Sequence, residues 1–234
     1  MDIDVDLDLS IDANGRDPDL YSPTLLKYHK LLWSKPLPNG QVFHLRDDIR
    51  GSYLVYESDS IQIKLGSDSI SNSYSNSQNK KIRQILQQVS SEDIVTFRNC
   101  GSTIGGYIVF PSTKIDGQMS INQARGFNPF ISDRFDLTLE CIKRFYCGFE
   151  SPLTKVLEQN EDFFRLFIDF RGYVNFFLLN DLVKDNYEQI DFFLPVNVFN
   201  ESPLPRSIDE YDKYRFNTMN FVRKRNQRIA ELNK

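Results

Sequence analysis

The stretch 103–146 constrains the fold most, because it requires a buried strand and an amphipathic helix within one core. Tyr107–Phe110 is apolar and follows Gly105-Gly106, which is typical of a short buried strand entered through a turn. Asp133 then precedes a helical pattern over about Arg134–Tyr146 and is placed to cap it. One face of that helix carries Phe135, Leu139, Ile142 and Tyr146. The two elements together predict a mixed α and β core.

The N-terminal part supplies further strand patterns. Residues 2–12 alternate Asp with Ile, Val and Leu, and a period of two predicts a half-buried strand. Ser22-Pro23 then has the signature of a helix start. Short strands are expected over Gln41–Leu45, Ser52–Tyr56 and Ser60–Leu65. These patterns predict a small antiparallel or mixed sheet from the N-terminal and central parts of the chain.

The remainder of the chain favours helices, concentrated after residue 130. Ser207-Ile208-Asp209-Glu210 has the spacing of a capping box and opens a long final helix. Phe163, Phe167 and Phe170 recur at helical spacing. The segment 173–183 is so apolar that a buried helix, which we favour, and a strand both remain open. The predicted fold class is α+β.

Composition indicates a soluble protein of one domain. A chain of 234 residues is long enough for one large domain or two small ones, and we expect one, spanning 1–234. The Ser- and Asn-rich segment 66–79 has little to bury and predicts a mobile loop. No apolar run has the length of a membrane span, the acidic start lacks the order of a signal peptide, and the three cysteines show no framework spacing. We therefore expect a cytoplasmic protein without a membrane segment.

Polar residues gather in the same central stretch and suggest a pocket for an anion. Arginine binds carboxylates and phosphates with two parallel hydrogen bonds, and adjacent glycines allow a close approach of backbone to a ligand. The candidate ligand-binding residues are Gly105, Gly106, Asn122, Arg125 and Arg134, and the candidate catalytic residue is Asp136. They predict binding of, or action on, a phosphorylated or otherwise anionic small molecule such as a nucleotide. The alternative is that Arg125 or Arg134 forms a buried ion pair with Asp133 or Asp136.

Motifs that would name a cofactor or a metal are absent from the sequence. No phosphate-binding loop, dinucleotide fingerprint or nucleophile elbow occurs. The two histidines, His29 and His44, lack paired ligand spacing, and Cys141 and Cys147 point to different faces of a helix. We therefore expect no metal site, and the sequence leaves the cofactor unknown.

Charge is polarised between the two ends of the chain. Residues 1–20 carry seven Asp and one Arg, whereas residues 213–234 carry seven Lys or Arg and one Glu. The second hypothesis is therefore a non-catalytic interaction module that uses an acidic N-terminal strand and a basic C-terminal helix to bind a protein partner or a second copy. Weak nucleic-acid binding would use Arg223, Lys224, Arg225 and Arg228. A solvated helix face is the competing interpretation.

Several segments along nearly the whole chain resemble an uncharacterised family of bacterial and phage proteins, a domain of unknown function. They are 17–25, 32–40, 104–106, 124–127, 133–142 and 176–179. The resemblance implies a single domain and a bacterial or phage source. It implies no catalytic residue and no cofactor. The interaction module of the second hypothesis would be a phage-related or defence accessory protein.

Overall fold

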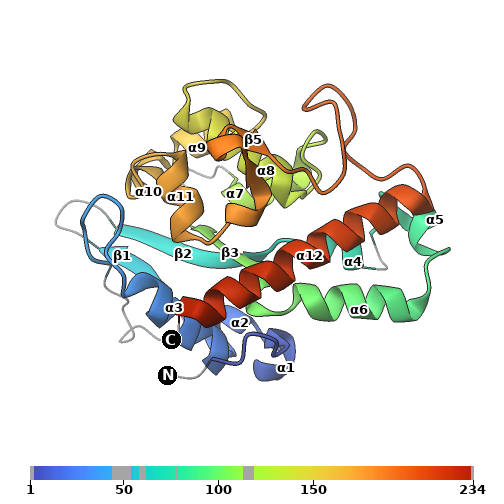
Figure 1. The fold of residues 1–234 in the computed structure, drawn as a ribbon, viewed down its shortest axis with the longest axis horizontal. Coiled ribbons are helices and arrows are strands. Elements are labelled where there is room, and N and C mark those ends of the chain that lie inside the picture. Colours follow the sequence, from blue (N-terminus) through green and yellow to red (C-terminus); the bar gives the residue numbers. More distant parts are fainter. Residues whose placement is uncertain (1–2, 44–53, 58–61, 77–78, 113–118, 233–234) are drawn as a thin grey trace.

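The computed structural model describes residues 3–43, 54–57, 62–76, 79–112 and 119–232. Its longest element is α12 (Ile208–Leu232), which crosses the molecule diagonally in Figure 1. In that view the helices of residues 121–176 gather above the sheet, and the N-terminal helices lie below it. The capping residue Ser207 accepts a hydrogen bond from the backbone N–H of Glu210, as the spacing predicted.

The main sheet is antiparallel and has the order β1-β2-β3 in the described residues. Its strands are β1 (Val55–Glu57), β2 (Gln62–Ser69) and β3 (Tyr107–Pro111). Ser69 pairs with Tyr107, and Lys64 pairs with Val55. A second pair joins β4 (Val183–Lys184) to β5 (Gln189–Ile190). The predicted α+β class, with its sheet from the N-terminal and central parts and helices in the C-terminal half, is confirmed.

The predicted strand over 2–12 is wrong. Within residues 3–12 the chain turns and forms α1 (Leu9–Asp12), followed by α2 (Pro18–Tyr21) and α3 (Pro23–Trp33). The cause is local: the Asp8 carboxylate accepts hydrogen bonds from the backbone N–H groups of Ser10 (2.8 Å) and Ile11 (3.3 Å). Aspartate side chains that bond neighbouring backbone groups compete with a strand ladder. Ile11, which the strand would have buried, is 72% exposed.

The segment 66–79 also differs from its prediction as a loop. Residues 66–69 complete β2, and α4 (Asn72–Ser75) follows directly. A β ladder is made by backbone groups, so small polar side chains do not prevent pairing. Ile70 and Tyr74 are fully buried and fix the segment to the core. Residues 77 and 78 lie outside the described ranges.

The remaining helices are short except for two. They are α5 (Arg83–Leu86), α6 (Ser91–Gly101), α7 (Ile121–Phe127), α8 (Phe135–Tyr146), α9 (Thr154–Glu158), α10 (Glu161–Arg165) and α11 (Phe170–Phe176). Helix is the outcome for 173–176, and a 3-10 turn with β4 follows. The predicted strand at Gln41–Leu45 does not form over 41–43, and its end lies outside the described residues. The start of the predicted strand Ser52–Tyr56 also lies outside them, and β1 begins at Val55.

Helix α8 is the central helix of the core. Every residue from Phe135 to Ile142 is buried, including the polar Asp136, Thr138 and Glu140. Asp133 does not cap it, because Arg134 takes the capping position and no side chain caps this helix. A helix buried on all sides carries polar residues only where they find partners. The partners of Asp136, Thr138 and Glu140 include the two candidate arginines, Arg125 and Arg134.

Candidate functional site

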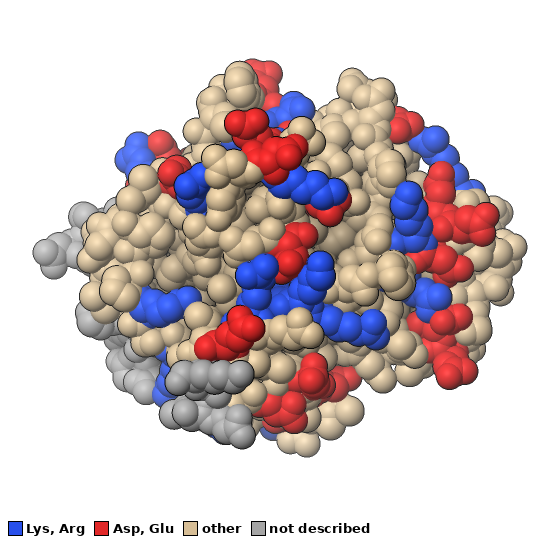
Figure 2. All heavy atoms as spheres, viewed as in Figure 1, with Lys and Arg blue, Asp and Glu red and all other residues tan. Residues whose placement is uncertain are grey.

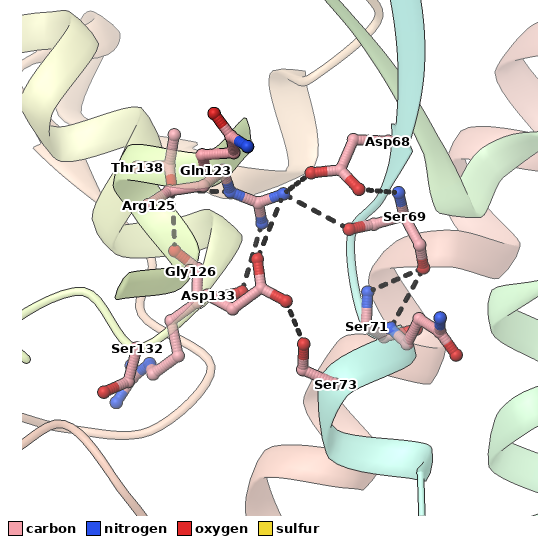
Figure 3. A network of polar contacts seen from close by, with 12 residues as sticks. Asp68, Ser69, Ser71, Ser73, Gln123, Arg125, Gly126, Ser132, Asp133 and Thr138 are labelled. Carbon is pink, nitrogen blue, oxygen red and sulfur yellow. Dashed lines mark hydrogen bonds and ion pairs between the residues drawn. The ribbon is translucent and has the colours of Figure 1, made fainter. Parts of the chain in front are cut away.

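Arg125 on α7 is completely buried and fully bonded within the chain (Figure 3). Its Nη1 lies 2.5 Å from Oδ2 of Asp68 and 3.3 Å from Oδ1 of Asp133. Nη1 also donates to the carbonyl of Ser69, Nη2 donates to the carbonyl of Asp133, and Nε donates to Oγ1 of Thr138. Burial raises the pKa of Asp133, although Arg125 opposes the shift. The guanidinium thus joins β2, α7 and α8, and its N–H groups point at protein acceptors.

Arg134 and Asp136 form a second closed pair. Both side chains are fully buried, and two parallel hydrogen bonds of 3.1 and 2.5 Å join them. Arg134 also donates to the carbonyls of Leu194 (2.7 Å) and Pro203 (3.0 Å). Asp136 accepts a further bond from the backbone N–H of Phe193. The pair therefore attaches the irregular segment 193–203 to the start of α8.

These contacts are the buried ion pairs that the sequence left open as the alternative to an anion site. Thr138 links the two arginines, since it accepts from Arg125 and donates to the carbonyl of Arg134. Glu140, one turn after Asp136, pairs with Lys143 (2.7 Å) and Arg144 (2.9 Å). The charges of the stretch thus neutralise each other inside the chain.

The Gly105-Gly106 pair approaches protein backbone closely. A Cβ atom on Gly105 would lie 2.5 Å from the carbonyl oxygen of Val222 in α12. One on Gly106 would lie 2.1 Å from the carbonyl oxygen of Gly101 in α6. The N–H of Gly105 donates to Oδ1 of Asn226 at 2.6 Å. Close packing therefore accounts for both glycines: Gly105 lies against α12 and Gly106 against the end of α6.

Asn122, the remaining predicted ligand residue, lies on α7 one turn before Arg125. Its Oδ1 atom is buried and accepts no hydrogen bond in the described part of the chain. An unsatisfied buried oxygen is uncommon in folded proteins. The contacts of the structure do not connect it to the other predicted residues.

The predicted basic surface on α12 is interrupted. Arg225 is 1% exposed and donates to the carbonyls of Phe177 and Gly105. Arg228 pairs with Asp181 at 2.5 Å, and Lys224 lies 3.9 Å from the same carboxylate. Figure 2 accordingly shows Asp and Glu side chains among the Lys and Arg side chains over the middle of α12. Of the four predicted residues, Arg223 is exposed and forms no ion pair with another described residue.

The acidic N-terminal residues are also engaged. Asp8 and Asp17 cap α1 and α2, and Asp12 accepts hydrogen bonds from Ser22 and from the backbone N–H of Thr24. The carboxylates of this segment stabilise helix starts and turns. The predicted acidic strand is therefore not formed, and these carboxylates cap helices and turns instead.

An open hollow of about 770 Å³ lies where no predicted site residue is found. We call it the α8–α10 hollow, since it is formed by the end of α8, the following loop, α9 and α10. It is lined by Phe145, Tyr146, Gly148, Phe149, Glu150, Thr154, Glu158, Glu161, Arg165 and Ile168. Phe149 is 67% exposed and Ile168 is 62% exposed.

Sequence reasoning missed the hollow because its residues come from helix ends. Phe149 follows Gly148, which ends α8 with φ of +71°, so it has no helical face on which to be buried. Ile168 adjoins the buried Phe167 and has φ of +69°, which turns the chain between α10 and α11. A large apolar residue directly after a helix-ending glycine is the one signal that pointed to this surface.

Two classes of site are not seen in the described ranges. No group of three His, Cys, Asp or Glu side chains there is placed to hold a metal ion. No helix among the described residues combines the length and the apolar character that a membrane crossing requires.

Fold and contacts together define an α+β protein of mostly short helices, whose buried arginines hold distant segments together. The chain belongs to the family of unknown function DUF6994, whose model matches residues 3–229. The expected membership of an uncharacterised family is confirmed by this match. No curated protein and no solved structure matches the chain.

Proposed function

We propose that this protein is a non-catalytic interaction module that docks a segment of a partner protein in the α8–α10 hollow. The observation that carries the proposal is the exposure of Phe149 and Ile168 on the wall of an open hollow. Large apolar side chains grouped at a concave surface are a mark of interaction sites. Covering them would release the free energy that drives association.

The anionic-ligand hypothesis has less support. Arg125 and Arg134 are fully buried and donate to carboxylates and carbonyls of their own chain. An anion that replaced Asp136 would leave a buried carboxylate without its partner, which is costly. The hollow, in contrast, is open to solvent and requires no rearrangement of the core.

The proposal keeps the interaction module of the second hypothesis but places its binding surface in the hollow, not at the charged ends of the chain. The setting that the sequence predicts, a reducing cytoplasm in a bacterial or phage context, forms part of the proposal. Cys100, Cys141 and Cys147 are all free, which supports the reducing compartment.

The test selects peptides from a displayed random library against the folded protein and measures their affinity for matched variants. Phe149→Asp and Ile168→Asp place a charge in the hollow, and Phe216→Asp does the same on α12, where Phe216 is 63% exposed. Burying one large apolar side chain contributes roughly 1.5–3 kcal/mol, so we expect affinity to fall about tenfold or more in the first two variants. Phe216→Asp should bind as the wild type does. Peptides that bind all four proteins equally, or a selection that yields none, would overturn the proposal.

A further inference from the structure

We infer that the partner segment anchors in the α8–α10 hollow through a cationic side chain, Lys or Arg, next to an apolar residue. This inference rests on the proposed function and specifies the partner as a basic amphipathic peptide segment. Three independent features of the hollow support it: uncompensated carboxylates, the end of a helix, and aromatic faces.

The carboxylates come first. Glu150, Glu158 and Glu161 line the hollow together with a single cation, Arg165. Arg165 pairs with Glu161 at 2.7 Å and is therefore already neutralised. Glu150 and Glu158 are exposed and form no ion pair with any described residue. A segment that brings a positive charge between them would form ion pairs with two carboxylates that have none within the fold.

The end of α8 adds to the same potential. Phe145 and Tyr146 lie in its last turn and line the hollow, whereas the two cations of that turn, Lys143 and Arg144, pair with Glu140. The C-terminal end of a helix carries a partial negative charge, which favours a cation and disfavours an anion. The negative end of the helix dipole therefore lies at the hollow that the three glutamates also line.

The aromatic side chains offer the complementary surface for the same anchor. The ring of Phe145 lies 5.6 Å from that of Tyr146, edge to face. The hydroxyl of Tyr146 donates to the carbonyl of Phe164, so its polar atom is already used. Phe149 adds an exposed ring. A guanidinium or ammonium group is attracted to such ring faces, and the attraction adds to that of the carboxylates.

Size favours a segment of protein over a small amine. The hollow has a volume of about 770 Å³, which is far larger than one ammonium or guanidinium group. The apolar surface also continues past the hollow. Asn128 Nδ2 donates to the carbonyl of Pro152, which brings the loop after α7 against the loop after α8. Phe127 at the end of α7 is 72% exposed, and Phe130 on the loop that follows is 41% exposed. Several side chains of an extended peptide can cover this surface together.

The experiment uses the peptides selected in the previous test, made synthetically with a fluorescent label and titrated by anisotropy. Each peptide is compared with a version in which every Lys and Arg is replaced by Gln. The protein variants are Glu158→Lys and Glu150→Lys in the hollow, and Glu231→Lys at the exposed end of α12 as the matched control. Circular dichroism confirms that each variant is folded before titration.

We expect the selected peptides to be enriched in Lys or Arg and to lose about tenfold in affinity on either the Gln replacement or the Glu158→Lys change, whereas Glu231→Lys leaves affinity within about twofold. Rising salt should weaken binding of the basic peptides. Peptides that are sensitive to Phe149→Asp yet neutral or acidic, or indifferent to Glu158→Lys and Glu150→Lys, would overturn this inference and leave the proposed function intact. Peptides indifferent to Phe149→Asp would overturn both.

Discussion

Replacing Arg125 with alanine separates the roles that the sequence allowed for this residue. The change removes four hydrogen bonds and the ion pair with Asp133, and it leaves Asp68 and Asp133 facing an empty space. Breaking a buried ion pair on one side costs about 3–5 kcal/mol. The Asp68 and Asp133 side chains are 29% and 21% exposed, so water can partly solvate them. We therefore expect a loss of about 3 kcal/mol, the lower end of that range.

The loss is measurable by urea unfolding with fluorescence detection. Trp33 is the single tryptophan and is completely buried against Phe43 and Phe176, so its emission reports the loss of the core. For a chain of this length about 1 kcal/mol shifts the melting temperature by roughly 2–4 °C, so a fall of about 6–12 °C is expected. Arg125→Lys should lie between the wild type and alanine, because it keeps the charge and loses the planar fork.

The control is Arg165→Ala, which removes an ion pair whose partners are 67% and 51% exposed. Exposed pairs contribute at most about 1 kcal/mol, and this variant should unfold close to the wild type. If Arg125→Ala unfolds within about 1 kcal/mol of the wild type, the buried network does not stabilise the fold as its geometry indicates.

Two further predictions concern single atoms in the core. Gly106→Ala should destabilise the fold by roughly 1–3 kcal/mol in thermal unfolding, because its Cβ would collide with the backbone of Gly101. Gly126→Ala, with open space around it, should be neutral or stabilising by up to about 1 kcal/mol. Equal melting temperatures of the two variants would contradict the packing described. Asp19 has a buried Oδ1 without a hydrogen bond, and burial raises the pKa of its carboxyl although the hydroxyl and N–H of Ser67 oppose the shift. Its contribution to stability is therefore complete below the unfolded-state pKa and is lost as pH rises through the folded-state pKa, so Asp19→Asn should gain stability over the wild type between acid and neutral pH. A stability difference that does not change with pH would refute this sign.

Local signals made much of the fold predictable. Ser22-Pro23 and Ser207 mark the starts of α3 and α12, and Tyr107–Phe110 lies within β3 as expected. In each case the deciding interaction lies within a few residues of the signal, so the sequence contains it. The strand predicted over 2–12 is wrong because a second local signal, the capping of α1 by Asp8, competes with the strand pattern in the same residues.

The fate of the predicted site depended on contacts across long stretches of chain. Whether Arg125 faces a ligand or a carboxylate is decided by Asp68, which lies 57 residues away in a segment predicted to be a loop. Arg134 finds its last acceptor in Pro203, 69 residues further on. The sequence shows that each arginine needs hydrogen-bond acceptors, but only the fold shows whether those acceptors belong to the protein or to a ligand. The hollow was missed for a different reason, since its lining residues between Phe145 and Ile168 come from helix ends and loops that carry no periodic pattern.

The contacts of Arg225 also determine when α12 can pack against the rest of the chain during synthesis. Its guanidinium donates to carbonyls of Gly105, Tyr107 and Phe177 and to the hydroxyl of Tyr28, and no carboxylate of a described residue compensates its charge. Moving that charge out of water is unfavourable unless all of these acceptors are already in position. The segments that supply them leave the ribosome well before α12 does. Until residues 208–232 have emerged, the nascent chain exposes the aromatic surface that α12 covers, and exposed apolar surface of this kind is prone to aggregation.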